Sequence, residues 1–312
     1  MLGTIGVVVT TPDAPSTLLE IQRLEDMGIP AAWLTSSGGG GDPLTLFAAA
    51  AVQTKRIVLG TSIIQIWPRH PLALANQVHT LASLAPGRLR LGVGPSHSAG
   101  MKRGFGVDLE DPLGHLREYV KILKGFLQEG SIDVEGRYYT ARAKTFQPVM
   151  VPVMISALRL RAFQLAGAEA DGAITWVCPQ RYLKDDAYPA LNLGAAMANR
   201  QTPPLIVHTP VAVHDNANEV KEAVRQQLGF YPKLPFYANM FADSGFSGAG
   251  NLGWTDELIE AVVAYGSEES VARRLQEIFA WGASEILVTV VTPGSDKVSS
   301  EERTLRLLAR LS

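Results

Sequence analysis

The chain has 312 residues, of which 46% are hydrophobic, and a formal net charge of −2, which leaves no basic face for a nucleic-acid partner. Its single cysteine, Cys178, excludes an intramolecular disulfide and a cysteine-based zinc site. No apolar run is long enough to span a membrane and no basic segment precedes the first apolar run, so we expect a cytoplasmic protein without a signal peptide.

Apolar segments rich in β-branched residues alternate with helical patterns along the whole chain. Five predicted strands cover residues 4–9, 57–64, 88–94, 151–156 and 205–213, and three more end the segments 27–34, 166–176 and 281–289. The predicted helices cover residues 15–27, 44–53, 72–84, 114–128, 161–166, 181–198, 217–228, 268–280 and 301–311. This α/β alternation predicts a parallel sheet, and the count of eight strands favours a closed (β/α)₈ TIM barrel, with residues 1–312 as one domain.

Three of these segments share a local pattern. In each, a helix ends, a glycine follows, and an apolar strand begins after a short linker; the glycines are Gly28, Gly167 and Gly282. Each glycine is therefore predicted to follow a helix in the left-handed conformation.

Two insertions interrupt the alternation. Residues 131–146, after strand four, have β-type residues around Glu135–Gly136, which predicts a hairpin. Residues 229–254, after strand seven, are rich in aromatic side chains compared with 7% in the whole chain. We expect this second insertion to fold over the barrel mouth; packing on a helix or on a dimer partner is the alternative.

Turns with polar residues follow the predicted strands at their C-terminal ends, where parallel barrels have their active sites. Trp67 and His70 follow strand three, His97 follows strand four, and Trp176 ends strand six. A histidine beside Gly94 at this edge is a candidate catalytic or cofactor-contacting group, although a lone histidine also serves as a structural hydrogen-bonding group. The alternatives are a helix cap for His70 and core packing for the two tryptophans.

Motifs of other cofactor classes are incomplete. The segment 92–97 begins like a dinucleotide fingerprint, but His97 stands at the third glycine position. The glycine run 38–41 lacks the Lys–Ser/Thr of a phosphate loop. No H-x-x-x-H or H-E-x-x-H spacing is present, so we expect no metal site.

Several segments, in chain order, resemble the bacterial luciferase-like superfamily. They are residues 59–63 with 69–75, 87–94, 166–173 and 266–283. The resemblance is greatest to the branch of oxidoreductases that uses the deazaflavin coenzyme F420, through the segments 69–75 and 231–237. It implies a (β/α)₈ barrel, usually a homodimer, with a small-molecule substrate and with the cofactor ring across the C-terminal mouth.

The resemblance also implies the residues of the site. In this family a non-prolyl cis peptide bond, by position Ser62–Ile63 here, backs the cofactor ring, and a turn after strand five holds the cofactor phosphate on backbone N–H groups. The implied cofactor contacts are Ser36, Thr61, Ser62, Ile63, Gly94, Ser156, Ala157, Leu158, Arg159 and Trp176. The implied substrate pocket contains Ser37, Trp67, His70 and Tyr237.

Three positions depart from the family pattern. Leu158 and Arg159 stand where glycines are common in the phosphate turn, and Arg159 can add a charge-assisted contact. Ser36–Ser37 stands where several F420 enzymes carry Asp–His. His97 holds the position of a proton-donating glutamate, and an imidazole can still transfer a proton near neutral pH.

The leading hypothesis is an F420-dependent oxidoreductase. It would transfer a hydride between the deazaflavin C5 and an activated C=C, C=O or C=N bond of a small, largely apolar substrate, with His97 handling the proton. The alternatives are an FMN-dependent monooxygenase and a non-catalytic barrel that binds flavin or another ligand.

Overall fold

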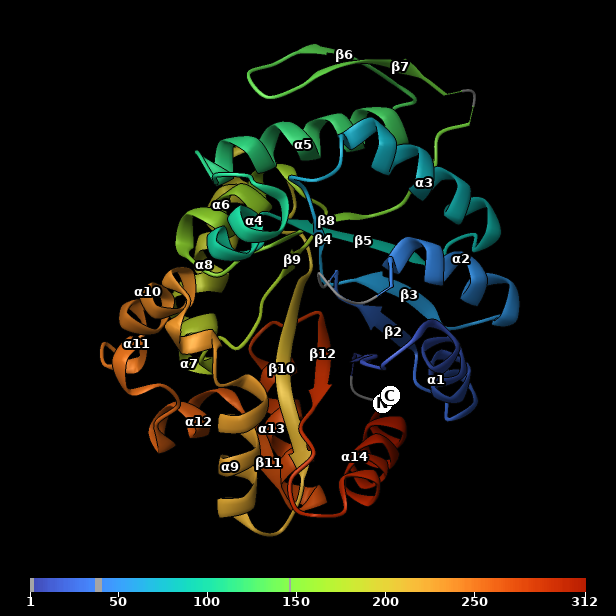
Figure 1. Ribbon diagram of the computed structural model, residues 1–312. Helices are drawn as coiled ribbons and strands as arrows, with labels where there is room; N and C mark the ends of the chain where they lie inside the picture. The colour runs from blue at the N-terminus through green and yellow to red at the C-terminus, as the bar shows by residue number, and fades with distance from the viewer. Residues whose placement is uncertain (1–2, 37–40, 146) are drawn as a thin grey trace.

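The computed structural model describes residues 3–36, 41–145 and 147–312. Its centre is a closed barrel of parallel strands with helices around it (Figure 1). The ring order is β1 (Thr4–Val8), β2 (Ala31–Leu34), β3 (Val58–Thr61), β5 (Leu89–Gly94), β8 (Val153–Ser156), β9 (Ala173–Ile174), β10 (Leu205–Val213) and β12 (Glu285–Val290). Because β12 also pairs with β1, the ring closes, and the predicted eight-stranded barrel is confirmed.

Helices connect successive barrel strands and begin at recognisable caps. The connecting helices are α1 (Ala14–Asp26), α2 (Pro43–Gln53), α3 (Pro71–Leu84), α5 (Pro112–Leu127), α6 (Leu160–Glu169), α8 (Tyr188–Met197), α9 (Ala217–Leu228), α13 (Glu268–Ala280) and α14 (Lys297–Leu311). Asp13 and Asp42 accept hydrogen bonds from Ser16 N and Thr45 N, at 2.8 and 2.9 Å. These aspartates satisfy amides that the first helical turn leaves free, and a proline in that turn has no amide to satisfy.

The predicted helix–glycine–strand pattern holds at two of its three positions. Gly28 and Gly282 have φ angles of 86° and 123°, as predicted. The prediction for Gly167 is wrong, because this residue lies inside α6. A Cβ atom on Gly167 would stand 2.1 Å from the carbonyl oxygen of Leu191 in α8, so the glycine serves close packing of the two helices.

Both predicted insertions are confirmed. After β5 come α4 (Ser98–Phe105), α5 and the antiparallel hairpin of β6 (Ser131–Glu135) and β7 (Thr140–Lys144). After α9 come the 3₁₀ turn η2 (Tyr231–Lys233), α10 (Pro235–Asp243), α11 (Ala249–Leu252), α12 (Asp256–Val262) and the short strand β11 (Ala264–Gly266), which pairs with the end of β10. The sequence did not predict α4, whose two glycines lower its helix propensity.

Two predicted elements are divided in the structure. The strand expected over residues 57–64 is interrupted at Ser62–Ile63, and its second part, β4 (Ile64–Gln65), pairs with the end of β5. The helix expected over 181–198 consists of α7 (Gln180–Tyr182), a π-helical turn η1 (Leu183–Ala187) and α8. Local pattern alone does not reveal such breaks, since the apolar periodicity continues through them.

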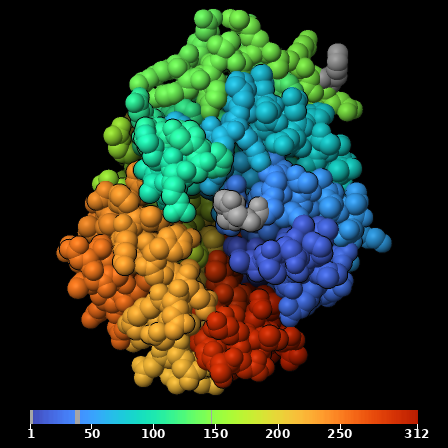
Figure 2. Space-filling model, viewed as in Figure 1, coloured from blue at the N-terminus to red at the C-terminus, as the bar shows by residue number. Residues whose placement is uncertain are grey.

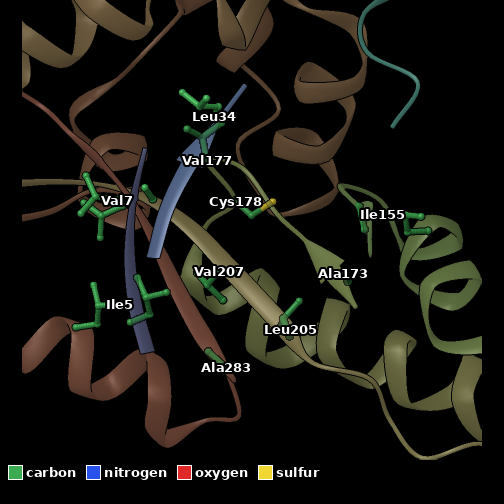
Figure 3. Packing of buried hydrophobic residues seen from close by; sticks show 14 of the residues in the cluster. Ile5, Val7, Leu34, Ile155, Ala173, Val177, Cys178, Leu205, Val207 and Ala283 are labelled. Atoms are coloured by element: carbon green, nitrogen blue, oxygen red, sulfur yellow. The ribbon is translucent and has the colours of Figure 1, made fainter. Parts of the chain in front are cut away.

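The main hydrophobic core fills the space between the barrel and its helices. Ile5 and Val7 of β1 and Leu205 and Val207 of β10 belong to it and are at most 4% exposed (Figure 3). Cys178 is buried in the same core, and burial raises the pKa of its thiol to about 12. The lone cysteine is therefore a buried packing residue and stays protonated.

A smaller core fills the inside of the barrel. Its central residue is Trp33, which is fully buried and occupies the space that glycines leave on the neighbouring strands. A Cβ atom on Gly6 or Gly60 would stand 2.5 or 2.4 Å from the Trp33 ring. This layer fills the barrel interior below the C-terminal ends of the strands.

Candidate active site

A cavity of about 2100 Å³ opens at the C-terminal ends of the barrel strands. Figure 2 shows the hollow near the centre of the face, between the blue-green α4 segment, the orange insertion and the blue and red ends of the chain. Among the described residues, its lining comes from barrel strands, from α4 and from the insertion after α9. The predicted position of the site, at the barrel mouth, agrees with this cavity.

One wall of the cavity is the break between β3 and β4. The Ser62–Ile63 peptide bond is cis, as predicted, and both residues line the cavity. Ser62 N donates to Leu34 O at 2.9 Å, and Ser36 N donates to Ile63 O at 3.1 Å. These bonds hold the break against the end of β2, and they bring Ser36 to the cavity beside it.

Three predicted cofactor contacts lie beneath this lining. Thr61 is fully buried, and its hydroxyl donates to Gly92 O and accepts from Gly92 N, which ties β3 to β5. Ala157 is 1% exposed. A Cβ atom on Gly94 would stand 2.2 Å from Ser156 Oγ, so the glycine makes room for Ser156 to line the cavity. The side chains of Thr61 and Ala157 are therefore buried beneath the cavity lining and are not placed to touch a cofactor directly.

The opposite wall carries Trp176 after β9, His208 in β10 and Thr289 in β12. His208 Nε2 lies 2.7 Å from Thr289 Oγ1, and the His208 ring packs on Trp176 with centroids 3.9 Å apart. Burial lowers the pKa of His208 to about 3, so its imidazole is neutral at pH 7. Sequence reasoning missed His208 and Thr289. Side chains alternate between the two faces of β10, so His208 shares the inward face with Ile206. This alternation in the sequence could have identified His208 as a residue of the barrel interior.

His97 borders the cavity between its two walls. It precedes α4, and its ring centroid lies 5.6 Å from that of Tyr237. His97 Nδ1 is buried and has no hydrogen-bond partner in the described part of the chain. Burial lowers the pKa of His97 below its usual value. The predicted catalytic histidine is thus in the cavity with a free ring nitrogen.

The aromatic residues of the insertion cover the wall formed by β9 and β10. The Tyr231 ring packs edge-on against Trp176 at 5.4 Å and against Tyr237 at 5.1 Å. Tyr237 is 5% exposed, and burial raises its pKa well above the usual value. The prediction that the insertion folds over the mouth is confirmed, and both tyrosines line the cavity.

The rim after β8 is basic. Leu158, Arg159 and Arg161 line it, and Arg159 Nε donates to Asp243 Oδ2 at 2.9 Å. Within the described residues, no side chain caps the N-terminus of α6, which starts at Leu160. Free amides at a helix N-terminus next to arginines suit a phosphate or carboxylate.

Two predicted pocket residues lie elsewhere. Trp67 stacks on His115 of α5 with ring centroids 3.9 Å apart, outside the cavity lining. His70 is exposed and caps α3, with Nδ1 accepting from Leu72 N at 3.2 Å. Neither residue lines the cavity, since Trp67 packs on α5 and the His70 ring packs edge-on against Tyr139 of the hairpin, so their assignment to the substrate pocket stays a prediction. Ser37 lies outside the described residues.

The described residues show neither a metal cluster nor a membrane-spanning helix. They contain no group of three or more His, Cys, Asp or Glu side chains arranged to hold a metal ion. In the same ranges, every helix is too short or too polar to cross a membrane. The polar groups that line the cavity are histidine, hydroxyl, indole and amide side chains, with arginines and aspartates at its rim.

Three known proteins are informative comparisons. The 5,10-methylenetetrahydromethanopterin reductase of Methanopyrus kandleri is 24% identical over 331 residues, 94% of each chain. The F420-dependent glucose-6-phosphate dehydrogenase of Beutenbergia cavernae is 33% identical over 176 residues, 54% of this chain and 52% of the relative. The structure of an F420-dependent secondary alcohol dehydrogenase with an F420–acetone adduct matches with a TM-score of 0.83 at 18% identity, covering 100% of this chain and 98% of the other.

The resemblance predicted from the motifs is tested by the family model. The model described as luciferase-like monooxygenase matches residues 4–285, which include every barrel strand up to the start of β12. The closed barrel, the cis peptide bond and the match to the family model all agree with the resemblance seen in the sequence. The chain belongs to the luciferase-like monooxygenase family.

Proposed function

We propose that this protein is a coenzyme F420-dependent oxidoreductase that acts on a small organic substrate. The observation that carries the proposal is the cavity of about 2100 Å³, which has a basic rim at the start of α6 and a mostly apolar and aromatic interior. Such a cavity suits a ring with an anionic tail. The names of two relatives, an F420-dependent dehydrogenase by sequence and another by fold, support the same cofactor.

The polar atoms of the cavity fit a deazaflavin ring. Three residues of the lining have a buried polar atom without a hydrogen-bond partner among the described residues: Ser62 Oγ, His97 Nδ1 and Trp176 Nε1. Buried polar groups need partners, and the carbonyl and nitrogen atoms along the edge of such a ring would supply them. The amides at the start of α6, with Arg159 and Arg161, would hold the phosphate.

Bound F420 supplies or accepts a hydride at its C5 atom. Trp176, Tyr231 and Tyr237 would enclose the substrate and exclude water. His97 is neutral at pH 7 because burial lowers its pKa, so its free nitrogen would take the proton that an alcohol loses on oxidation. In the direction of reduction, protonated His97 would return that proton to the product.

The second candidate is an FMN-dependent monooxygenase, which the description of the family favours. Titration of the purified protein with each cofactor discriminates between the two, with F420 followed by its fluorescence and FMN by its absorbance. We expect micromolar binding of F420 and much weaker binding of FMN. Tight FMN binding without F420 binding would reverse the order. Binding without redox turnover, over a panel of carbonyl, alkene and imine substrates, would favour a ligand-binding barrel.

A further inference from the structure

His208 lies across the barrel from the Ser62–Ile63 wall. In the closed ring, β10 stands four strands from β3 in either direction, and β12 is its direct neighbour. Both His208 and Ser62 line the one cavity, from opposite sides. If the Ser62–Ile63 wall held the cofactor ring, His208 and Thr289 would border the space left for the substrate.

One nitrogen of His208 is available to a ligand. Nε2 is engaged with Thr289 Oγ1 at 2.7 Å, whereas Nδ1 makes no hydrogen bond with any described residue. His208 is 5% exposed, and its ring packs at a tilt of 37° against Trp176, which restricts its orientation together with the contact to Thr289. Since His208 lines the cavity and Nδ1 has no partner among the described residues, a ligand oxygen in the cavity can take up this hydrogen bond.

The charges of the cavity are confined to its rim. The charged lining residues among those described are all exposed: Arg103, Asp111, Arg159, Arg161 and Asp243. The deeper lining from β9, β10 and β12 is uncharged, and burial keeps His208 neutral. A carboxylate or phosphate beside His208 would therefore lose its hydration without gaining a cation.

We propose that His208 and Thr289 bind a neutral carbonyl or hydroxyl oxygen on the reacting carbon of the substrate. This inference rests on the proposed function. With the Thr289 hydroxyl donating to Nε2, the Nδ1–H of His208 donates to the carbonyl oxygen. On oxidation, the hydrogen of the alcohol C–H bond would leave with the bonding electron pair, as a hydride, and bound F420 would supply the acceptor at its C5 atom. The O–H proton goes to His97, and the new C=O group stays bonded to His208. Reduction runs the same steps in reverse.

The first test needs no cofactor. NMR of the protein labelled with ¹⁵N at its six histidines reports the protonation state of each ring, and the His208→Gln variant identifies the His208 signals. We expect a neutral imidazole from pH 5 to 8 that shifts when cyclohexanone is added but not when acetate is added. A His208 that titrates in this range, or that ignores cyclohexanone, would overturn the inference.

The second test uses reduced F420 with cyclohexanone and, as a substrate with a charged neighbour, pyruvate. Thr289→Val keeps the shape but removes the hydroxyl, and we expect kcat/KM for cyclohexanone to fall about tenfold. Thr289→Ser should restore the activity, and His79→Gln, a surface histidine, should leave it unchanged. Preference for pyruvate, or full activity of Thr289→Val, would contradict the inference. Failure of the wild-type protein to bind F420 would instead contradict the proposed function. The first test would still show whether His208 binds a neutral carbonyl group.

Discussion

Among single residues, the two histidines of the cavity have different environments. His97 stands at the end of β5 and precedes α4, so its sequence position is enough to predict a place at the barrel mouth. His208 lies inside a nine-residue buried strand, where polar residues are uncommon. Its role depends on Trp176, which follows β9, and on Thr289 of β12. The sequence pattern does not predict such contacts between segments that are far apart in the chain.

His97→Gln tests the proton transfer. We expect kcat to fall on the order of 100-fold, because the amide keeps a hydrogen bond but cannot take a proton. Burial lowers the pKa of His97, so oxidation by the wild-type protein should lose activity only as the pH falls below the ordinary histidine range, and this acid limb should vanish in the variant. Steady-state kinetics from pH 4.5 to 8 provide the measurement. An unchanged kcat would remove His97 from the mechanism.

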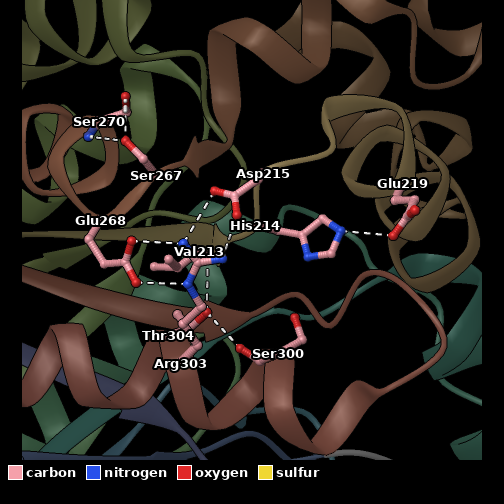
Figure 4. Close-up of polar contacts among 10 residues, drawn as sticks. All are labelled: Val213, His214, Asp215, Glu219, Ser267, Glu268, Ser270, Ser300, Arg303 and Thr304. Carbon is pink, nitrogen blue, oxygen red and sulfur yellow. Dashed lines mark hydrogen bonds and ion pairs between the residues drawn. The ribbon is translucent and has the colours of Figure 1, made fainter.

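At the scale of elements, a polar cluster joins α13, α14 and the start of α9. Arg303 of α14 pairs through both sides of its guanidinium group with Glu268 of α13 and with Asp215 (Figure 4). Hydrogen bonds from Arg303 lower the pKa of Glu268 to about 2 from 4.5. A bidentate pair of this kind fixes the last helix against the one before it.

Glu268→Gln should lower the free energy of unfolding at pH 7 by about 1 kcal/mol, since the pair is more than one-third exposed and screened by water. The folded pKa is depressed, so the stabilisation is present above pH 4.5 and is lost as the pH falls toward 2. Urea unfolding of both proteins at several pH values should show the difference shrinking over that range. Glu135→Gln in the exposed hairpin pair with Arg142 is the matched control, with an expected change near zero. A difference that does not depend on pH would contradict this assignment.

At the scale of the whole molecule, an ion pair crosses the closed base of the barrel. Arg90 of β5 pairs with Glu285 of β12, two strands on opposite sides of the ring. Glu285 is 4% exposed, and burial lowers the pKa of Arg90. The pair lies in the barrel interior together with the layer around Trp33, at the end away from the cavity.

Removing one partner of this pair should cost more than removing both. We expect Arg90→Met alone to lower the free energy of unfolding by about 3 kcal/mol, because it leaves the buried Glu285 carboxylate unpaired, and Glu285→Leu alone to cost less, because the Arg90 side chain is 26% exposed. The double variant should recover most of that loss. Guanidinium unfolding curves measure all three variants. Two additive single losses would show that the charges do not depend on each other.

The sequence by itself determined the parallel barrel, both insertions, the family and the positions of Ser62–Ile63, His97 and Tyr237, because each follows from local periodicity or from a contiguous motif. The homodimer stays a prediction. Only the tertiary structure decided that Trp67 packs on α5, that His70 caps α3 outside the cavity and that His208 lines the cavity. The direction of a side chain after a strand depends on which distant elements pack there. The stacking of Trp67 on His115 and the pairing of β10 with β12, which brings Thr289 beside His208, are such contacts, and no local pattern contains them.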